Sequence, residues 1–281
     1  MKKIHFIYSL VFVAVLFFAS CEKGLETVEY ASTVYLPQSG PSVKTPLLGE
    51  SVLQLGVYHA GVNQPTKSLA VTLGVDEAAG AAFIALNAGY EMLPSSYYSL
   101  PQTQVKLDGE RAFLPINMKG IDVNFSGKKY ILPISIQSVD KEVTVSEAQK
   151  TAILQFTRFR NVFETKYKAY GQVVLSGTAD TDKAKIDEVI SSTSVDANTI
   201  QVKGAAANMN LLLTVQNGQV QVTGAPGSEA FNIENTPGKT STYSGNFSDQ
   251  YQCNQGTYTL YYTYTASGKQ MDATVELKFW L

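Results

Sequence analysis

The chain has 281 residues, and its 22 basic and 24 acidic side chains give a formal net charge of -2 at pH 7. This balance argues against a nucleic-acid-binding protein, which would carry a concentrated positive charge. Beyond residue 20 the only histidine is His59, so most zinc sites and most general-base schemes are excluded.

The first twenty residues have the composition of an export signal. Lys2 and Lys3 give a positive start, and residues 6–18 are almost wholly apolar. That apolar run has about the length of a signal-peptide core and is shorter than the roughly 20 residues that a membrane-spanning helix needs. We therefore expect a signal peptide over residues 1–20.

The end of this segment, Phe18-Ala19-Ser20-Cys21, resembles the lipobox of bacterial lipoproteins. The resemblance implies that the thiol of Cys21 is acylated and that cleavage leaves this cysteine as the new N-terminus. Phe18 departs from the usual leucine, and an ordinary secretory signal with a chance cysteine is the alternative. Residues 21–32 are polar without periodicity, which is typical of a flexible lipidated tether.

Cleavage before Cys21 would leave 20 basic residues against 24 acidic ones, a net charge of -4. Cys253 would be the only other cysteine. We therefore expect no intrachain disulfide and a fold that packing alone stabilises. The remaining roughly 260 residues exceed the usual size of one domain, so two domains are expected.

Residues 33–158 contain short segments typical of β-strands. In 53–57 and 69–75 apolar residues alternate with small or polar ones, and this period of two indicates strands with one buried face. The alanine-rich residues 77–86 are the best helix candidate. About seven strands separated by turn residues predict an immunoglobulin-like β-sandwich over 33–158.

Two of these strands contain a proline, Pro115 and Pro133. A proline has no N–H group to donate to the ladder. We therefore expect both prolines at a sheet edge or a bulge rather than in mid-sheet.

Several short elements of this half occur in a characteristic order. They are Leu69-Ala-Val-Thr-Leu-Gly-Val-Asp76, Leu86-Asn87, Tyr90-Glu-Met-Leu-Pro94, Tyr97-Tyr98 and Tyr130-Ile-Leu-Pro-Ile-Ser-Ile136. Their order resembles a lipoprotein module of the Bacteroidota, the domain of unknown function 1735 family, over about Thr33 to Thr157. The resemblance implies a lipobox, this β-sandwich, a variable C-terminal β-domain and association with SusC/SusD-type glycan-uptake systems. It carries over no catalytic residues.

Residues 163–281 predict a second antiparallel β-domain, either a lipocalin-like barrel or a sandwich. Asn217-Gly218 tolerates the positive φ angles of a type I′ hairpin turn. Residues 183–191 are ambiguous between a strand and one or two helical turns.

The clearest element of this half is the C-terminal hairpin. A two-residue turn at Ser267-Gly268 would pair Tyr262 with Ala273 and Thr259 with Glu276. One face of the hairpin is then apolar or aromatic and the other polar, so that register and burial agree. The apolar face carries Tyr258, Tyr262 and Tyr264, and the polar face carries Tyr261 and Trp280.

Aromatic side chains are the main candidates for ligand binding, because sugars stack their C–H faces on rings. The candidates are Tyr97 and Tyr98, in a segment that follows Pro94, and Tyr261 and Trp280 on the polar face of the hairpin. Six residues separate Tyr261 from the position opposite Trp280, roughly 20 Å along a strand, so these two cannot form one platform. For each candidate, the simpler interpretation is a half-buried surface aromatic.

No motif for catalysis or metal binding is evident. The acidic residues are scattered, Asp180 and Asp182 lack the remainder of a calcium loop, and a glycine-rich phosphate loop is missing. We therefore expect no enzymatic activity, no cofactor and no metal.

Together these features predict a non-catalytic lipoprotein of the outer membrane, surface-exposed rather than periplasmic. We expect it to bind glycans for a polysaccharide-uptake system and to contact a SusC/SusD-type transporter. The alternative is a structural or assembly lipoprotein that contacts a partner protein through exposed β-edges.

Overall fold

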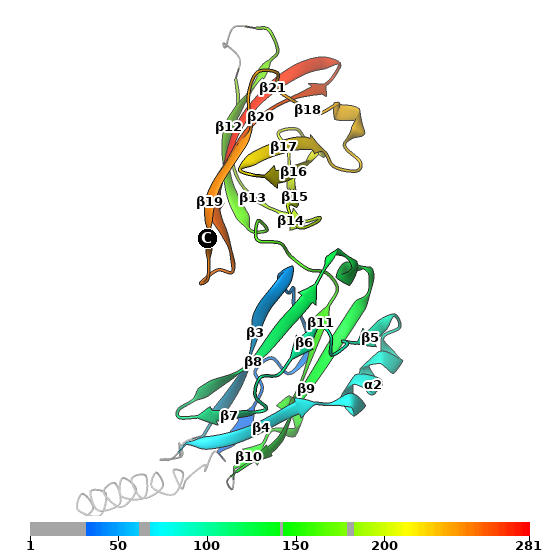
Figure 1. Cartoon of the computed structure of the whole chain (residues 1–281), viewed down its shortest axis with the longest axis vertical. Helices are drawn as coiled ribbons and strands as arrows, with labels where there is room; N and C mark the ends of the chain where they lie inside the picture. The colour runs from blue at the N-terminus through cyan, green and yellow to red at the C-terminus, as the bar shows by residue number, and fades with distance from the viewer. Residues whose placement is uncertain (1–31, 62–67, 141–142, 179–182) are drawn as a thin grey trace, which may run out of the picture.

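The computed structural model describes residues 32–61, 68–140, 143–178 and 183–281. The expected signal peptide, Cys21, most of the tether, Asp180 and Asp182 lie outside the described residues. Two domains built almost entirely of strands follow one another along the chain (Figure 1), which confirms the predicted fold class. None of the helices in the described part is long and apolar enough to cross a membrane.

The N-terminal domain is a sandwich of two sheets. The first sheet has the order β10-β1-β3-β8-β6 and the second has the order β2-β11-β9-β4-β7, with β5 also paired to β9. The first contains β1 (Thr33–Tyr35), β3 (Gly49–Ala60), β6 (Tyr98–Ser99), β8 (Arg111–Ile121) and β10 (Thr144–Val145). The second contains β2 (Gly40–Val43), β4 (Leu69–Val75), β5 (Tyr90–Met92), β7 (Gln104–Leu107), β9 (Lys129–Val139) and β11 (Thr151–Phe156).

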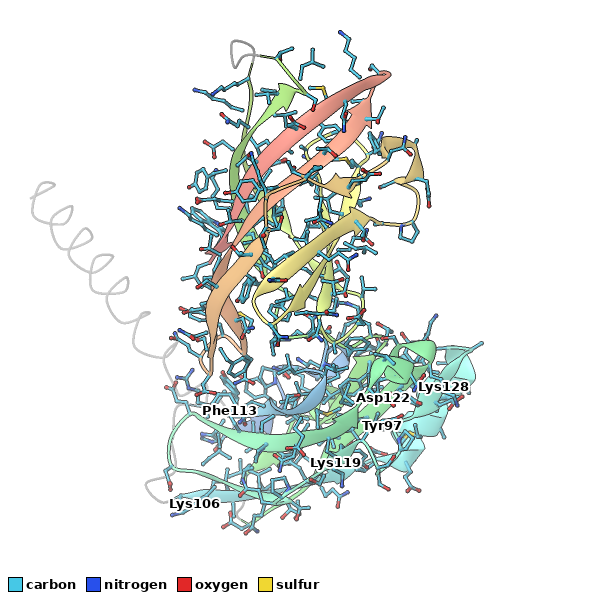
Figure 2. All side chains as sticks on the ribbon, turned by 45° about the horizontal axis from the view of Figure 1, so that its top comes forward. Tyr97, Lys106, Phe113, Lys119, Asp122 and Lys128 are labelled. Atoms are coloured by element: carbon cyan, nitrogen blue, oxygen red, sulfur yellow. The ribbon has the colours of Figure 1, made fainter. Side chains whose placement is uncertain are left out.

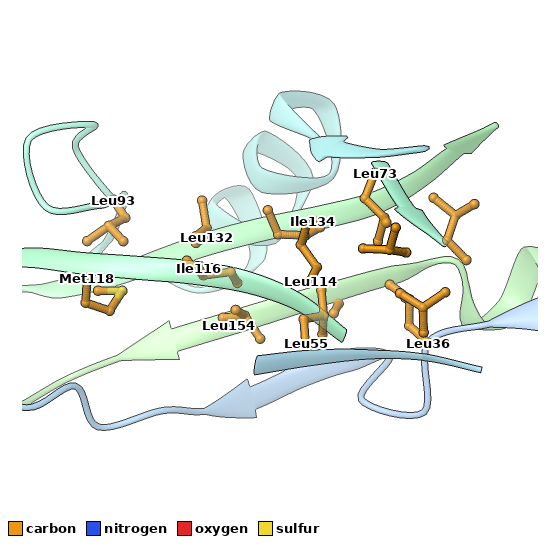
Figure 3. Close-up of a cluster of buried hydrophobic side chains, with 14 of the residues drawn as sticks. Leu36, Leu55, Leu73, Leu93, Leu114, Ile116, Met118, Leu132, Ile134 and Leu154 are labelled. Carbon is orange, nitrogen blue, oxygen red and sulfur yellow. The ribbon is translucent and has the colours of Figure 1, made fainter. Parts of the chain in front are cut away.

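The inward-facing residues of the two sheets form one core (Figure 3). In β8, Leu114, Ile116 and Met118 are all buried, as the period of two predicts. They meet Leu132 and Leu154 from the opposite sheet. Full burial of such a side chain contributes about 1.5–3 kcal/mol, so the alternating pattern accounts for much of the stability of this domain.

The predicted helix is α2 (Glu77–Leu86), which connects β4 to β5. Asp76 caps its N-terminus, because one carboxylate oxygen accepts the Ala79 N–H at 2.9 Å. The other accepts the hydroxyl of Ser135 at 2.6 Å. A side chain at Gly80 would come within 3.0 Å of the Pro133 ring, so the glycine lets the helix lie directly on β9. The helix thus lies beside β9 in the gap between β4 and β5, where a paired strand would otherwise lie.

The prediction for the two prolines is correct for Pro115 and wrong for Pro133. The nitrogen of Pro115 faces the side of β8 where β6 pairs only with Asn117 and Met118, so this part of β8 is an open edge. Pro133 instead lies in β9, in the middle of the sheet. Its nitrogen faces the gap between β4 and β5 where α2 is inserted, and its carbonyl accepts the Asp76 N–H at 3.0 Å. The missing N–H group of Pro133 therefore costs the sheet no hydrogen bond.

The C-terminal domain is a single ten-stranded sheet with the order β13-β12-β21-β20-β19-β17-β16-β15-β14, and β18 pairs with β20. The sheet curls on itself (Figure 1), and an ion pair between Lys203 and Glu188 at 2.6 Å joins β15 to β13 across its edges. Of the two predicted alternatives, a barrel or a sandwich, the C-terminal domain therefore adopts the barrel-like fold. Its strands are β12 (Lys166–Leu175), β13 (Ala184–Ser191), β14 (Thr193–Ser194), β15 (Thr199–Lys203), β16 (Asn210–Gln216), β17 (Gln219–Gly224), β18 (Glu234–Asn235), β19 (Thr242–Ser248), β20 (Cys253–Ala266) and β21 (Lys269–Trp280).

The predicted hairpin register is confirmed. Tyr262 pairs with Ala273 and Thr259 with Glu276, and the turn at Ser267-Gly268 has φ angles of 50° and 73°. The interior of the curled sheet is filled by side chains, including the three tyrosines of the apolar face. The cavity inside it has a volume of about 10 Å³, room for about one water molecule. The described part of the barrel therefore has no ligand chamber of the lipocalin kind.

Candidate functional site between the two domains

The four aromatic candidates do not form one site. Tyr97 packs its ring against Phe125 and Tyr130, with centroid distances of 5.3 and 5.8 Å. Figure 2 shows it at the end of the N-terminal domain that also carries Asp122 and Lys128. Tyr98 in β6 is half-buried, and burial raises its pKa. Both rings therefore support the core of the sandwich.

Tyr261 and Trp280 lie on the outer face of the C-terminal sheet, as predicted. The ring of Tyr261 is half-buried, with the Lys239 ammonium 5.1 Å from its centroid. Trp280 is 46% exposed and lies opposite Lys166 of β12. Whether either residue binds a ligand remains a prediction. Cys21 lies outside the described residues, and His59 is a buried residue of β3 whose imidazole bonds to the hydroxyl of Ser32.

A larger concave site lies between the two domains. It is a cleft with a volume of about 690 Å³. One wall is the outer face of β3, β8 and β6, and the other is the tip of the β19–β20 hairpin. The cleft is lined by Glu50, Ser51, Val52, Gln54, Ser99, Asn117, Met118, Lys119, Asp249 and Gln252. Figure 2 labels Phe113 and Lys119, two outward-facing residues of β8, of which Lys119 lines the cleft.

The lining of the cleft combines amides, hydroxyls and charged groups around an apolar side chain. The side chains of Gln54, Asn117 and Lys119 make no hydrogen bond with any described residue, so their polar groups are available to a ligand. Each amide offers both a donor and an acceptor. Val52 is 50% exposed beside them. Such an arrangement suits a ligand that has many hydroxyl groups and small apolar faces.

The hairpin tip has a fixed shape. Gln252 adopts a left-handed backbone conformation with a φ of 51°. Its side-chain amide donates to the carbonyl of Asp249 at 2.8 Å, which closes the turn. The carboxylate of Asp249 remains on the cleft wall. The tip therefore presents its polar groups on a constrained loop, and less conformational entropy is lost when a ligand binds.

The connection between the domains holds this tip against the N-terminal domain. The Arg160 N–H donates to the carbonyl of Pro46, and the Leu48 N–H donates to the carbonyl of Arg160, at 2.9 and 2.8 Å. The guanidinium of the same residue donates to the carbonyl of Gln252 at 2.7 Å. Arg160 is thus bonded to both domains, and burial lowers its pKa.

The residues around Arg160 are fixed to the C-terminal domain. Asn161 is buried, and its amide donates to the carbonyls of Asp196 and Thr199 at 2.7 and 3.0 Å. Glu164 forms two bonds of 2.8 Å with Arg158. Burial opposes ionisation of Glu164, but the bonds from Arg158 and Ser194 outweigh it and lower the pKa of this carboxyl group. The connection is therefore held to the C-terminal domain by several hydrogen bonds.

Exposed aromatic rings lie next to the hairpin tip. The ring of Tyr251 contacts Phe279 with a centroid distance of 5.8 Å. Phe247 and Trp280 are 45% and 46% exposed near the same end of the sheet. Tyr251 lies directly before Gln252, a residue of the cleft lining. Aromatic rings beside a polar cleft are typical of surfaces that bind sugars.

The cleft could not be predicted from the sequence. Its residues come from segments near positions 50, 99, 118 and 250, and none of them forms a motif. The one available signal was the polar composition of the outward-facing positions in β3 and β8.

The comparisons with known proteins agree with this fold. A family model described as a "-like, N-terminal domain" matches residues 30–143, less than half of the chain. No curated protein matches the chain. A structure from Bacteroides ovatus of unknown function is 15% identical and covers 89% of this chain and 94% of its own, with a TM-score of 0.53. That similarity shows a shared two-domain fold.

Two further structures from Bacteroides ovatus are more distant. A multidomain protein that includes DUF1735 is 14% identical over 88% of this chain and 92% of its own, with a TM-score of 0.42. A protein described as a candidate carbohydrate-binding protein is 12% identical over 88% and 97%, with a TM-score of 0.36.

Proposed function

We propose that the protein is a non-catalytic glycan-binding protein and that the cleft between its domains holds a polysaccharide segment. The observation that carries the proposal is the set of unpaired amides of Gln54 and Asn117 beside the exposed Val52. Amides can donate to one sugar hydroxyl and accept from the next, while an apolar side chain contacts a C–H face. The volume of about 690 Å³ is adequate for a few sugar units.

The experiment is a calorimetric titration of the purified protein with a panel of soluble neutral polysaccharides. The double variant Gln54→Ala with Asn117→Ala should weaken binding about tenfold, because each lost hydrogen bond contributes about 0.5–1.5 kcal/mol. Gln270→Ala, an exposed amide next to the β20–β21 turn, is the matched control and should bind normally. Equal affinity of all three proteins would place the glycan elsewhere.

The cleft also contains two carboxylates, Glu50 and Asp249, so hydrolysis has to be tested directly. We expect no release of reducing ends from any polysaccharide that binds. Release that disappears in Glu50→Gln or Asp249→Asn would contradict the non-catalytic part of the proposal. Failure to bind any polysaccharide would instead favour an assembly role.

The location of the protein is part of the same proposal. The lipobox-like residues before Cys21 support a lipid-anchored protein. The resemblance of residues 33–157 to Bacteroidota lipoproteins extends the proposal to a surface-exposed position on the outer membrane and to a SusC/SusD-type transporter as partner. Metabolic labelling with a palmitate analogue tests the anchor, because Cys21→Ala should abolish the label. Retention of the label in that variant would refute acylation at this cysteine.

A further inference from the structure

A second groove lies on the outer surface of the C-terminal domain and shares no lining residue with the cleft. It has a volume of about 340 Å³. The β16–β17 hairpin forms one side, and the segment from β18 to the start of β19 forms the other. The groove is lined by Thr214, Gln216, Gln219, Val220, Gln221, Asn235, Lys239, Thr240 and Ser241.

Three exposed glutamines line the hairpin side of this groove. Gln216 is paired with Gln219, and Gln221 is paired with Thr214, so the amides lie on neighbouring strands and on the same face. Among the described residues none of the three amides has a hydrogen-bond partner. Together they offer donors and acceptors in adjacent positions. Asn235 differs, because its amide is bonded to both backbone groups of Val222 and fixes the edge of the groove.

Lys239 stands at the other side of the groove in a defined position. It follows Pro237-Gly238 in a tight turn, in which its N–H donates to the carbonyl of Thr236 at 3.2 Å and Gly238 has a φ of 75°. Proline followed by a glycine with positive φ is typical of a type II turn. The ammonium lies 5.1 Å from the ring centroid of Tyr261. A cation over an aromatic ring is held in place while its other side can still accept an anion.

The charge of this groove differs from that of the cleft. Its lining contains the cation Lys239 and no carboxylate, whereas the cleft contains Glu50 and Asp249 beside Lys119. We propose that the groove binds an acidic sugar residue, a uronate, whose carboxylate bonds to Lys239 and whose hydroxyls bond to the glutamine amides. The protein would then have two carbohydrate sites with different charge preferences.

The test is calorimetry of the full chain with two oligosaccharides of equal length, an oligogalacturonate and its neutral, carboxyl-reduced counterpart. Lys239→Gln should weaken uronate binding about tenfold, because a hydrogen bond to a charged group is worth about twice a neutral one. Affinity for the neutral oligosaccharide should change less than twofold. Salt should weaken uronate binding to the wild type and have little effect on the variant.

Lys269→Gln is the control, since this exposed lysine is the first residue of β21 and is not part of the groove. The double variant Gln219→Ala with Gln221→Ala should weaken binding of both oligosaccharides to the groove, which separates amide recognition from charge. If Lys239→Gln and Lys269→Gln bind the uronate equally well, the charge attraction is non-specific and the groove is not the site. Absence of uronate binding to the wild type would also overturn the proposal.

The two sites can be tested independently. The cleft variant Gln54→Ala with Asn117→Ala should retain uronate binding, because none of its changes touches the groove. A loss of uronate binding in that variant alone would move the acidic-sugar site to the cleft. A polysaccharide that binds the cleft normally in Lys239→Gln would leave the proposed function intact.

Discussion

Tyr262 and Trp280 lie on opposite faces of one hairpin and should respond differently to truncation. Tyr262 is 1% exposed, and its hydroxyl accepts the Ala205 N–H at 3.2 Å. Tyr262→Ala should lower the free energy of unfolding by about 3–5 kcal/mol, because it leaves a cavity in the filled barrel. Trp280→Ala should change it by less than about 0.5 kcal/mol.

Denaturant melts of both variants check this prediction, and Tyr262→Phe is the graded control. That variant loses only the bond to Ala205, so its cost should be about 1 kcal/mol. Similar destabilisation by Trp280→Ala and Tyr262→Ala would show that Trp280 belongs to the core.

At the scale of single residues, the sequence predicts which side chains are buried better than it predicts which residues they contact. The period of two correctly separated Tyr258 and Tyr262 inside from Tyr261 and Trp280 outside, because alternation follows directly from strand geometry. It could not predict that Lys239 covers the ring of Tyr261, since the two residues meet only through the tertiary fold.

At the scale of elements, α2 depends on one capping carboxylate. Hydrogen bonds from Ser135 and from the Ala79 N–H lower the pKa of Asp76. The stabilisation by this carboxylate is therefore complete above its pKa in the unfolded chain, about 3.9, and is lost as the pH falls through the lower value in the folded protein.

Asp76→Ala should accordingly lower the free energy of unfolding at pH 7 by about 1 kcal/mol or more, because the cap and the Ser135 bond are lost together. The difference between variant and wild type should shrink when the pH is lowered below about 4. Urea melts at pH 7 and at pH 3 measure it. The same difference at both values would contradict a role for the charge.

Elements with regular alternation were predictable, and those that depend on a partner were not. β20 and β21 were predicted with their register, whereas β19 was not predicted at all. Its sequence, Thr242–Ser248, is polar and contains Gly245. That glycine pairs with Gly256 of β20, and a side chain at either one would collide with the hydroxyl of Tyr243. The glycines that weaken the local signal are therefore required by the packing.

At the scale of the whole molecule, the two walls of the cleft depend on Arg160. Arg160→Ala removes the guanidinium bond to the Gln252 carbonyl and keeps the backbone bonds to Pro46 and Leu48. The domains should then sample a wider range of orientations, because a fixed contact between them is lost. Glycan affinity of the cleft should fall about threefold to tenfold. Part of the binding free energy is then used to bring the two walls of the cleft into the binding orientation.

Fluorescence energy transfer between dyes on the two domains checks this expectation. The distribution of distances should broaden in Arg160→Ala and should stay narrow in Arg111→Ala, a matched change at an exposed arginine of β8. An unchanged distribution would mean that the backbone contacts alone set the orientation.

The sequence predicted two β-domains because each has its own alternating strands, but it could not predict how they meet. The cleft walls come from the start of β3, from β6 and β8, and from a hairpin tip near residue 250. Exposed polar residues at such positions have no periodicity that distinguishes a binding wall from an ordinary surface. Only the arrangement of the connection around Arg160 brings them together.

The filled barrel has a consequence for how such a protein can diversify. Its packing occupies every second position of the long strands, so the intervening outward positions, such as Gln219, Gln221 and Trp280, can change with little effect on folding. Under the proposed glycan-binding function, mutation at these positions would exchange one ligand preference for another on an unchanged scaffold. A lineage exposed to new polysaccharides would need to alter only these outward positions, and a shared fold at 15% identity is compatible with that freedom.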